Sequence, residues 1–235
     1  MPTGILHAPA QPAAGDTRFF TDEGYTDRQT KALHIAAKYA EILTGSVLDV
    51  GCDRAPLREL VQDPSRYVGV DMTDEAADIV VDLDRAALPF ADRSFDCVVC
   101  TDVLEHLERC HAVFDDLCRV SRRWVVASLP NNLGVLVQSL AEGLEGRLKQ
   151  YGLPVDPPAD RHRWFFGAED ARQFVRERAR RAGFVVEQCD QEPMPVYHWR
   201  TGGAGASRDL LDHPNIRGGT LWWALRRRDA DGTGA

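Results

Sequence analysis

The sequence predicts an α/β fold built on a doubly wound, mostly parallel sheet of seven strands. Short and nearly continuous apolar runs alternate with helical stretches over residues 27–130, which is typical of strands buried on both faces. Several of these runs end in acidic or polar residues, at the place where open parallel sheets bind their ligands. A further helical stretch after the fifth apolar run predicts an insertion above the sheet.

The elements of the first half are predicted from their hydrophobic spacing. A first helix is expected over residues 27–44, ended by Gly45. Five of its side chains can share one face: Leu33, Ala36, Ala37, Ala40 and Leu43. Two more helical stretches are expected at 56–62 and 103–120. The apolar runs predict five strands: residues 46–50, 66–72, 77–83, 95–102 and 123–130.

Residues 131–166 interrupt this alternation. They combine a helical stretch with a proline-rich segment that carries His162 and several aromatic residues. We expect them to form a lid over the substrate, because functional loops lie above such sheets. The remaining elements are predicted as a helix at 168–183 and strands at 184–190 and 220–228. One domain is expected over residues 17–228, flanked by disordered segments at 1–16 and 229–235.

Composition narrows the classes of partner. A formal net charge of −8 and a pI of about 5.4 disfavour a nucleic acid as the partner. No apolar run reaches the roughly eighteen residues of a membrane span, and the first residues lack the basic start of a signal peptide. We therefore expect a cytoplasmic protein with no membrane partner, for which a homodimer stays open. Cys97 and Cys100 form a C-x-x-C pair, but they lie in a predicted strand without a second pair, so we expect buried thiols.

The stretch VLDVGCDRAP, residues 47–56, predicts a ligand-binding turn after the first strand. Its Asp53 and Ala55 stand where a dinucleotide-binding fingerprint has glycines, which argues against a pyrophosphate. Asp71 ends the next strand about twenty residues on, the spacing of an acid that binds a ribose diol. The acid-rich strand ends favour a ligand with hydroxyls, an amine or a positive centre.

Four segments in this order resemble the class I S-adenosylmethionine-dependent methyltransferases, in the small-molecule, methyltransferase-11-like branch: LDVGCD, GVDM, LPFADRSFDCVV and DVLEHLE. The similarity covers roughly residues 45–130 and, more weakly, 160–190. It implies a Rossmann-like fold, S-adenosylmethionine as the cofactor, and methyl transfer to a small molecule. Among acceptors, a hydroxyl of a sugar or secondary metabolite is expected.

The resemblance also implies cofactor-binding residues by their position in the family motifs. The turn would contribute Asp49, Gly51, Cys52 and Asp53, with Gly51 allowing close backbone approach and Asp49 anchoring the turn and the amine end of the cofactor. The other implied contacts are Asp71 at the ribose, Met72, Asp82 and Leu83 at the adenine, and Thr101 or Asp102 beneath the methionine part. The family usually has further glycines at the positions of Asp53 and Ala55, although Asp tolerates left-handed dihedrals better than most residues.

The catalytic candidates are Asp102, His106 and His162. Each histidine is either a base that takes a proton from a substrate hydroxyl or a structural side chain. Asp102, Asn131 and Asn132 with a histidine could hold Mg²⁺, although nothing in their spacing requires a metal. Two other functions stay open: a non-catalytic nucleoside-binding partner protein with this fold, and an NAD or nucleotide-sugar enzyme on the same sheet.

Overall fold

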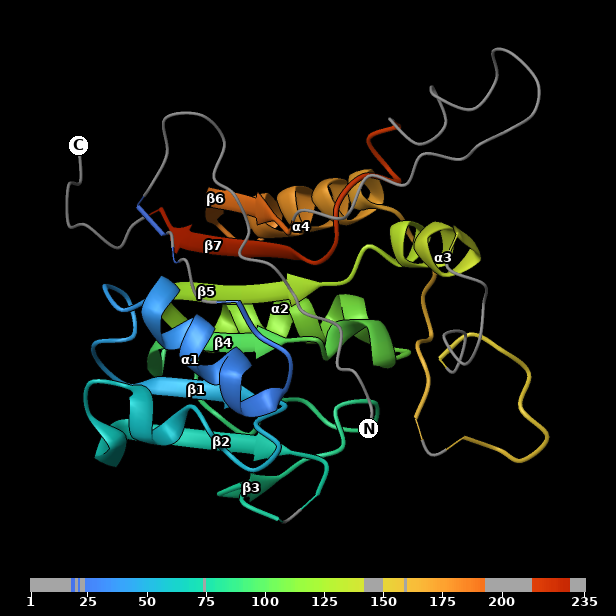
Figure 1. The fold of residues 1–235 in the computed structure, drawn as a ribbon. Coiled ribbons are helices and arrows are strands. Elements are labelled where there is room, and N and C mark those ends of the chain that lie inside the picture. Colours follow the sequence, from blue (N-terminus) through green and yellow to red (C-terminus); the bar gives the residue numbers. More distant parts are fainter. Residues whose placement is uncertain are drawn as a thin grey trace, which may run out of the picture.

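The computed structural model describes residues 18–19, 21, 24–73, 75–141, 150–158, 160–192 and 213–228, so the segments expected to be disordered lie outside the described residues. Seven strands form one sheet in the order β3-β2-β1-β4-β5-β7-β6 (Figure 1). Their bounds are β1 Val47–Val50, β2 Tyr67–Asp71, β3 Ile79–Val80, β4 Phe95–Thr101, β5 Ser121–Leu129, β6 Phe184–Gln191 and β7 Leu221–Arg227. Neighbouring strands pair in parallel except that β7 is antiparallel to β5 and β6. The predicted mostly parallel sheet is confirmed.

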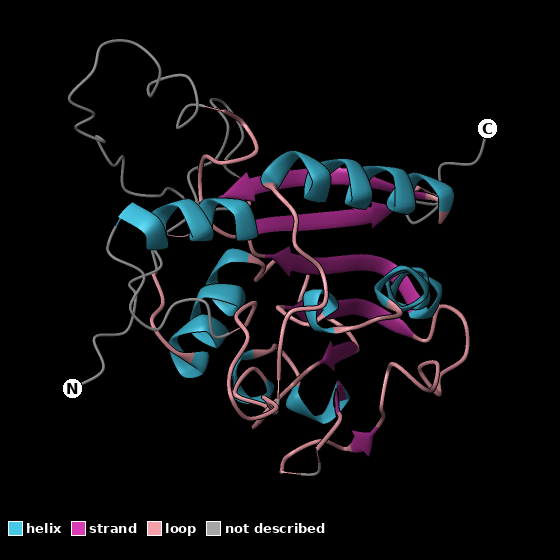
Figure 2. Ribbon diagram, turned by 90° about the vertical axis from the view of Figure 1, so that its right-hand side faces the viewer, coloured by secondary structure: helices cyan, strands magenta, loops and turns pink. Residues whose placement is uncertain are grey.

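Helices cover both faces of this sheet (Figures 1 and 2). The covering helices are α1 (Arg28–Lys38) on one face and α2 (Cys110–Val120) and α4 (Ala168–Arg181) on the other. α3 (Asn132–Ala141) follows β5, as the predicted insertion requires. The hydrophobic core has two parts, one on each face of the sheet. In β7, Trp222 packs on the α1 side and Trp223 packs on the α2 side, and both are fully buried. Cys97 and Cys100 also lie on opposite faces of the sheet, so they cannot share a metal ion.

Four elements are clearly shorter than the sequence predicts. The first helix, expected over residues 27–44, ends at Lys38 and is followed by turns up to Gly45. The helix expected at 56–62 is the single 3₁₀ turn η1 (Arg58–Leu60), because so few residues form too few hydrogen bonds to offset the entropy cost of starting an α-helix. The strand expected at 77–83 keeps two residues, as an edge strand that pairs only with β2. The helix expected at 103–120 is divided into the 3₁₀ turn η3 (Leu104–His106) and α2, because the backbone is extended at Leu107. A further 3₁₀ turn, η2 (Pro64–Arg66), leads into β2.

The buried face of α1 differs from the predicted one. Leu33 is 43% exposed, whereas the lysines Lys31 and Lys38 and the histidine His34 face the sheet. An apolar-spacing argument misses this face because its lysines are neutralised by partners on other elements. Lys38 donates to Asp190 at 2.6 Å, and Lys31 donates to Asp102 at 2.5 Å. α1 is therefore held to the sheet by two ion pairs as well as by apolar packing.

Within the described residues, no helix is both long and apolar enough to cross a bilayer.

Replacing Lys38 by Met tests the inner ion pair. Its two side chains are 1% and 2% exposed, so the variant leaves the Asp190 carboxylate buried without its cation. We expect the free energy of unfolding to fall by about 3–5 kcal/mol, measured by urea denaturation. Arg180→Ala is the control, because its ion pair with Glu177 is exposed and should contribute below about 1 kcal/mol. Similar losses in the two variants would contradict a structural role for the buried pair.

Candidate active site

A cleft of about 620 Å³ opens at the carboxyl ends of β1, β2 and β4. Six of the residues expected to bind the cofactor line it: Gly51, Asp53, Asp71, Met72, Asp82 and Leu83. Two of the catalytic candidates, Asp102 and His106, line it as well, and the 158–163 segment closes one side. The volume lies within the range of small-molecule sites. Most of the predicted site residues therefore lie together at this cleft.

The turn after β1 keeps a glycine-like backbone although it has only one glycine. Gly51 has φ +79°, and Asp53 and Ala55 both have φ +51°, the left-handed region that L-residues enter at a cost. The Oδ2 of Asp71 accepts a hydrogen bond from the amide of Asp53 at 2.9 Å, which fixes the turn to the end of β2. The departure from the family's glycines therefore leaves the turn's shape in place.

The acidic residues after β3 separate into two roles. Asp84 accepts a hydrogen bond from the amide of Arg109 at 3.1 Å, directly before α2. Asp82 is exposed in the cleft, and among the described residues its side chain pairs with the neighbouring exposed Arg85 and with the amide of Asp84. Met72, 72% exposed, and Leu83 provide apolar surface beside them. Asp82 is therefore free to meet a ligand, whereas Asp84 organises the chain.

Three predicted cofactor residues do not line the cleft: Asp49, Cys52 and Thr101. Asp49 is buried beneath the turn, where the Tyr67 hydroxyl donates to it at 2.6 Å. Burial raises the pKa of Asp49 to about 6, against the hydrogen bond from Tyr67 and the charge of Lys31. The Cys52 thiol packs under Gly69, and burial raises its pKa to about 12, so only its backbone can serve a ligand.

Asp102 is a fixed anion at the end of β4. Lys31 and the hydroxyl of Ser128, at 2.7 Å, each hold one of its carboxylate oxygens. Burial opposes ionisation, but the charge and hydrogen bond of Lys31, with help from Ser128, lower the pKa of Asp102 to about 2. A carboxylate with so low a pKa is a poor proton acceptor near neutral pH. It is suited to binding a cation, and Lys31 is a site residue that the sequence reasoning missed.

A loop of the insertion docks on η3 and brings the two candidate histidines together. The amide of Arg163 donates to the carbonyl of Glu105 at 2.7 Å, and the indole of Trp164 donates to the carbonyl of Leu107 at 2.7 Å. The His106 and His162 rings consequently meet edge to face at 4.6 Å. The Asp160 carboxylate accepts a hydrogen bond from His106 Nδ1 at 2.7 Å, and the Tyr151 hydroxyl is hydrogen-bonded to His162 Nδ1 at 2.6 Å.

Burial dominates the titration of the inner members of this group. Glu105 is 2% exposed, and burial, reinforced by the charge of Asp102, raises its pKa well above the usual range. Burial also lowers the pKa of His162 to about 4, with the neighbouring His106 as the next cause. His162 is therefore uncharged near neutral pH. The sequence had singled out both histidines but used Glu105 only as their neighbour.

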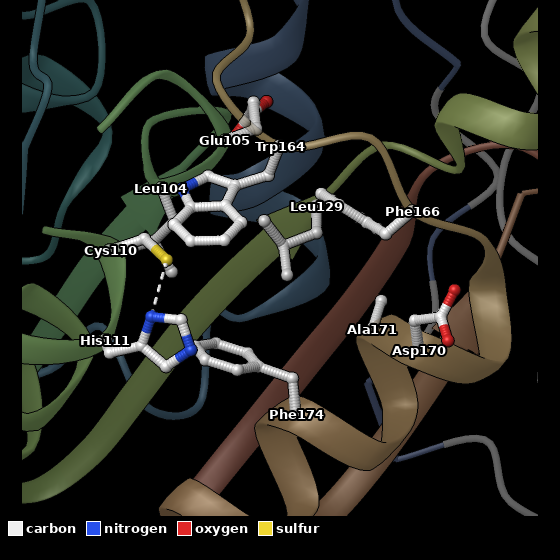
Figure 3. A pocket seen from close by; sticks show the side chains of 10 residues that line it. All are labelled: Leu104, Glu105, Cys110, His111, Leu129, Trp164, Phe166, Asp170, Ala171 and Phe174. Atoms are coloured by element: carbon white, nitrogen blue, oxygen red, sulfur yellow. Dashed lines mark hydrogen bonds between the residues drawn. The ribbon is translucent and has the colours of Figure 1, made fainter. Parts of the chain in front are cut away.

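A separate apolar cavity of about 160 Å³ lies between η3, α2 and α4 (Figure 3). Its walls are mostly apolar side chains, among them Leu104, Leu129, Trp164, Phe166 and Phe174. Glu105 stands at its edge, which accounts for the dry surroundings of that carboxylate. The cavity is too small for a nucleoside, so the cleft above the strands is the candidate cofactor site.

The Mg²⁺ site considered from sequence is not assembled. Asn131 is buried, its amide nitrogen donating to carbonyls of residues 216–218 and its oxygen accepting from the amide of Gly134. The amide of Asn132 donates to the carbonyl of Trp164. Both side chains thus hold neighbouring loops rather than facing Asp102.

Comparison with known proteins is consistent with this geometry. A family model described as a methyltransferase domain matches residues 25–188. An S-adenosylmethionine-dependent methyltransferase from Archaeoglobus fulgidus aligns at 15% identity over 86% of this chain and 95% of that one, with a TM-score of 0.53. Magnesium protoporphyrin IX methyltransferase from Synechocystis PCC 6803, with bound S-adenosylhomocysteine, aligns at 16% identity over 85% and 83%, with a TM-score of 0.52.

A third solved structure is a complex between the Trm112 methyltransferase activator of Haloferax volcanii and a methyltransferase. It aligns at 20% identity over 85% of this chain and 90% of that one, with a TM-score of 0.52. At these identities the likenesses show a shared fold. No curated protein matches the sequence.

Two glycines with the same backbone allow a matched test of the turn. Gly51 and Gly183 have φ +79° and +80°, but a Cβ on Gly51 would lie 2.3 Å from Val103 Cγ2, whereas one on Gly183 meets nothing within 4 Å. Gly183→Ala should cost only the left-handed backbone term, about 1–2 kcal/mol of unfolding free energy. Gly51→Ala should cost at least about 1 kcal/mol more, because the clash adds to it.

The double variant Gly51→Ala/Val103→Ala tests whether the clash with Val103 causes the additional loss of unfolding free energy expected for Gly51→Ala. Removing the Val103 methyl groups should relieve the clash, so the additional cost of the Gly51 substitution should shrink when it is made in a Val103→Ala background. Urea denaturation of the wild type, the two single variants and the double variant completes the cycle. Equal losses for Gly51→Ala and Gly183→Ala would show that Val103 does not crowd the turn.

Proposed function

The chain belongs to the methyltransferase domain family, and from this membership and the cleft we infer that it transfers a methyl group from S-adenosylmethionine to a small-molecule hydroxyl. The observation that carries the inference is an acid-lined cleft at the carboxyl ends of β1, β2 and β4. S-adenosylmethionine brings an adenosine, an ammonium group and a sulfonium, and it has no phosphate. Acidic side chains suit its cations, and one carboxylate at the end of β2 suits its ribose.

The cofactor half of the cleft is assigned by position. Asp71 would accept hydrogen bonds from the ribose hydroxyls, since it ends β2 and lines the cleft. Met72 and Leu83 would contact the adenine, with Asp82 as the exposed acceptor at its amino edge. Gly51 and the amides of the following turn would pass beside the methionine part. Asp49 supports that turn from beneath through Tyr67.

Asp102 is the proposed anchor of the cofactor's positive end. It is ionised at every pH of interest and is held on two sides by Lys31 and Ser128. Because its position is fixed before binding, it can attract an ammonium or sulfonium without reorganising. We therefore propose an electrostatic role for Asp102 and not that of a base. Thr101, the last residue of β4, pairs with Ser128 in the register of the sheet and so fixes the backbone before Asp102.

Methyl transfer itself is a direct displacement. The acceptor oxygen attacks the methyl carbon, the new C–O bond forms as the C–S bond breaks, and the electron pair leaves with sulfur. The enzyme contributes mainly positioning and removal of the hydroxyl proton. His106 lines the cleft, with His162 behind it, so this end of the cleft would receive the acceptor.

The acceptor is proposed to be a sugar or secondary-metabolite hydroxyl. The 158–163 segment narrows the cleft at the histidine end, which suits a small molecule better than a polymer. The net charge of −8 opposes a polyanionic substrate. The lid role of residues 131–166 is proposed on the same ground, since its described part docks on η3 beside the histidines.

Calorimetric titration with S-adenosylmethionine and S-adenosylhomocysteine, with NAD as the control ligand, tests the function. We expect both sulfur ligands to bind with micromolar affinity and NAD not to bind. Mass spectrometry of hydroxylated acceptors incubated with enzyme and cofactor then detects the added methyl group. Binding of NAD alone would overturn the proposal.

Asp71→Asn should weaken S-adenosylmethionine binding by roughly 10- to 100-fold. The amide removes the charge and one acceptor oxygen, and a hydrogen bond to a charged group contributes about 1.5–3 kcal/mol. Asp92→Asn is the control, because Asp92 is exposed and pairs with Arg119 outside the cleft. Titration calorimetry should show wild-type affinity for the control. Unchanged affinity in Asp71→Asn would remove Asp71 from the site.

A further inference from the structure

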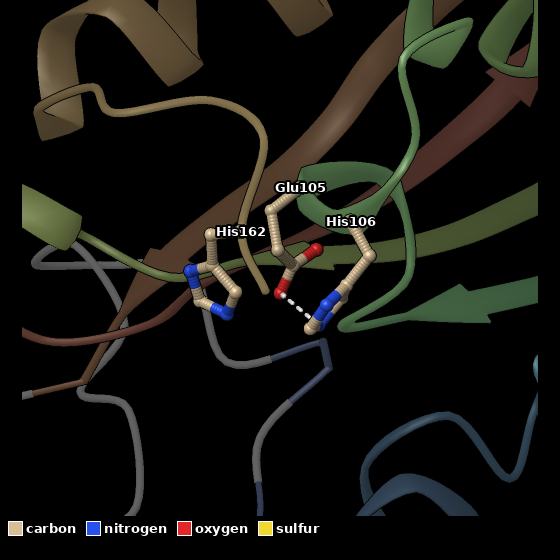
Figure 4. Close-up of side chains that lie close together, drawn as sticks. All are labelled: Glu105, His106 and His162. Carbon is tan, nitrogen blue, oxygen red and sulfur yellow. Dashed lines mark ion pairs between the residues drawn. The ribbon is translucent and has the colours of Figure 1, made fainter. Parts of the chain in front are cut away.

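Glu105, His106 and His162 form a compact group of ligand-type side chains beside the cleft (Figure 4). One ligand atom from each lies within 4.8 Å of the other two. Glu105 and His106 come from η3, whereas His162 comes from the docked loop of the insertion. In Figure 4 the carboxylate of Glu105 lies between the two imidazole rings. Metal–ligand bonds of about 2.1 Å would require each side chain to move inward by about 1 Å.

Buried carboxylate oxygens in proteins normally have a hydrogen-bond partner, and Glu105 departs from this rule. The residue is 2% exposed, and its Oε2 has no hydrogen-bond partner among the residues that the structure describes. Its Oε1 lies 4.0 Å from His106 Nε2, beyond hydrogen-bonding distance. Other buried carboxylates in the chain are satisfied, as Asp190 is by Lys38 and Asp49 by Tyr67. A buried carboxylate oxygen without a partner is costly, and a cation would remove that cost.

Both histidines are oriented as metal ligands are. Nδ1 of His106 is engaged by Asp160 at 2.7 Å, and Nδ1 of His162 is engaged by the Tyr151 hydroxyl at 2.6 Å. Each ring therefore has its Nε2 available to the group. A carboxylate or hydroxyl on the far nitrogen fixes the tautomer and the ring plane of a ligating histidine. Tyr151 and Asp160 thus act as positioning residues.

We propose that Glu105, His106 and His162 bind one divalent transition-metal ion. Two imidazole nitrogens and one carboxylate oxygen form the donor set found for Zn²⁺ and Fe²⁺ sites that keep open coordination positions. His106 lines the cleft beside Asp102, so the open positions face the proposed acceptor end. Imidazole donors favour transition metals over Mg²⁺. The site differs from the Asp102–Asn131–Asn132 set, which the structure does not assemble.

The role of the ion rests on the proposed function. An ion held by these three side chains would lower the pKa of an acceptor hydroxyl that it binds. The hydroxyl proton would pass to solvent as the oxygen attacks the methyl carbon, and the C–S bond would break with its electron pair going to sulfur. The ion would thereby supply the proton removal that an oxygen nucleophile needs.

Co²⁺ titration of the chelator-treated full chain tests the site. Visible absorption reports the coordination of bound Co²⁺, and Zn²⁺ competition gives the affinity. We expect one Co²⁺ per chain, displaced by Zn²⁺ and displaced at least about 100-fold less well by Mg²⁺. Glu105→Gln should weaken binding by about 10- to 100-fold or more, whereas Glu108→Gln, an exposed glutamate of the same segment, should bind as the wild type does.

Several outcomes overturn the proposal. Absence of stoichiometric binding by the wild-type chain would show that Glu105 is a buried carboxyl without a metal. Wild-type affinity in Glu105→Gln would place the ion elsewhere. Circular dichroism checks folding, and His162→Asn provides a second variant if Glu105→Gln does not fold. Calorimetric titration with S-adenosylmethionine separates the two proposals: metal binding without cofactor binding would sink the proposed function alone, and cofactor binding without metal binding would sink this inference alone.

Discussion

The ion pair between Lys31 and Asp102 connects the first helix with the floor of the cleft. Asp102 ends β4 with a left-handed backbone and is half-buried, so its charge depends on the ammonium group 2.5 Å away. Lys31 in turn is 7% exposed, and its ammonium group lies over the ring of Trp222. Neither charge would be tolerated without the other. The pair thereby sets the position of α1 against the end of β4 and keeps the Asp102 carboxylate ionised beside the cleft.

The cleft is assembled from two parts that are held by different contacts. The cofactor part lies on strand ends whose register is fixed by the sheet, with Asp71 fastening the turn after β1. The acceptor part depends on one loop, which docks on η3 through the backbone carbonyls of Glu105 and Leu107. The same loop contacts the side chain of His106 through Asp160 and the ring of His162. Docking therefore fixes the His106 ring as well as the backbone of η3.

The sheet and most of the cofactor half were predictable because both depend on local patterns. Continuous apolar runs identify buried parallel strands, and acids at their ends identify the ligand edge, so Asp71, Asp82 and Asp102 were correctly placed at one cleft. The buried face of α1 was predicted wrongly, because Lys31 and Lys38 are polar residues whose partners lie 71 and 152 positions away. The sequence did not single out Glu105 for the same reason, since the residues that surround it are distant along the chain. Its burial follows from the docking of residues 160–167, and a pairing between distant segments leaves no local pattern to read.

Docking of this loop and occupation of the acceptor end are coupled by thermodynamics. Glu105 and His106 belong to η3, and His162 belongs to the loop, so the three side chains come together only in the docked conformation. Any ligand that contacts all three binds that conformation and no other. It must then stabilise docking by mass action, in proportion to its concentration relative to its dissociation constant. Docking also places Asp160, Arg161 and Arg163 along the cleft and Trp164 at the neighbouring apolar cavity. An ion or acceptor that binds all three side chains would therefore stabilise the docked loop.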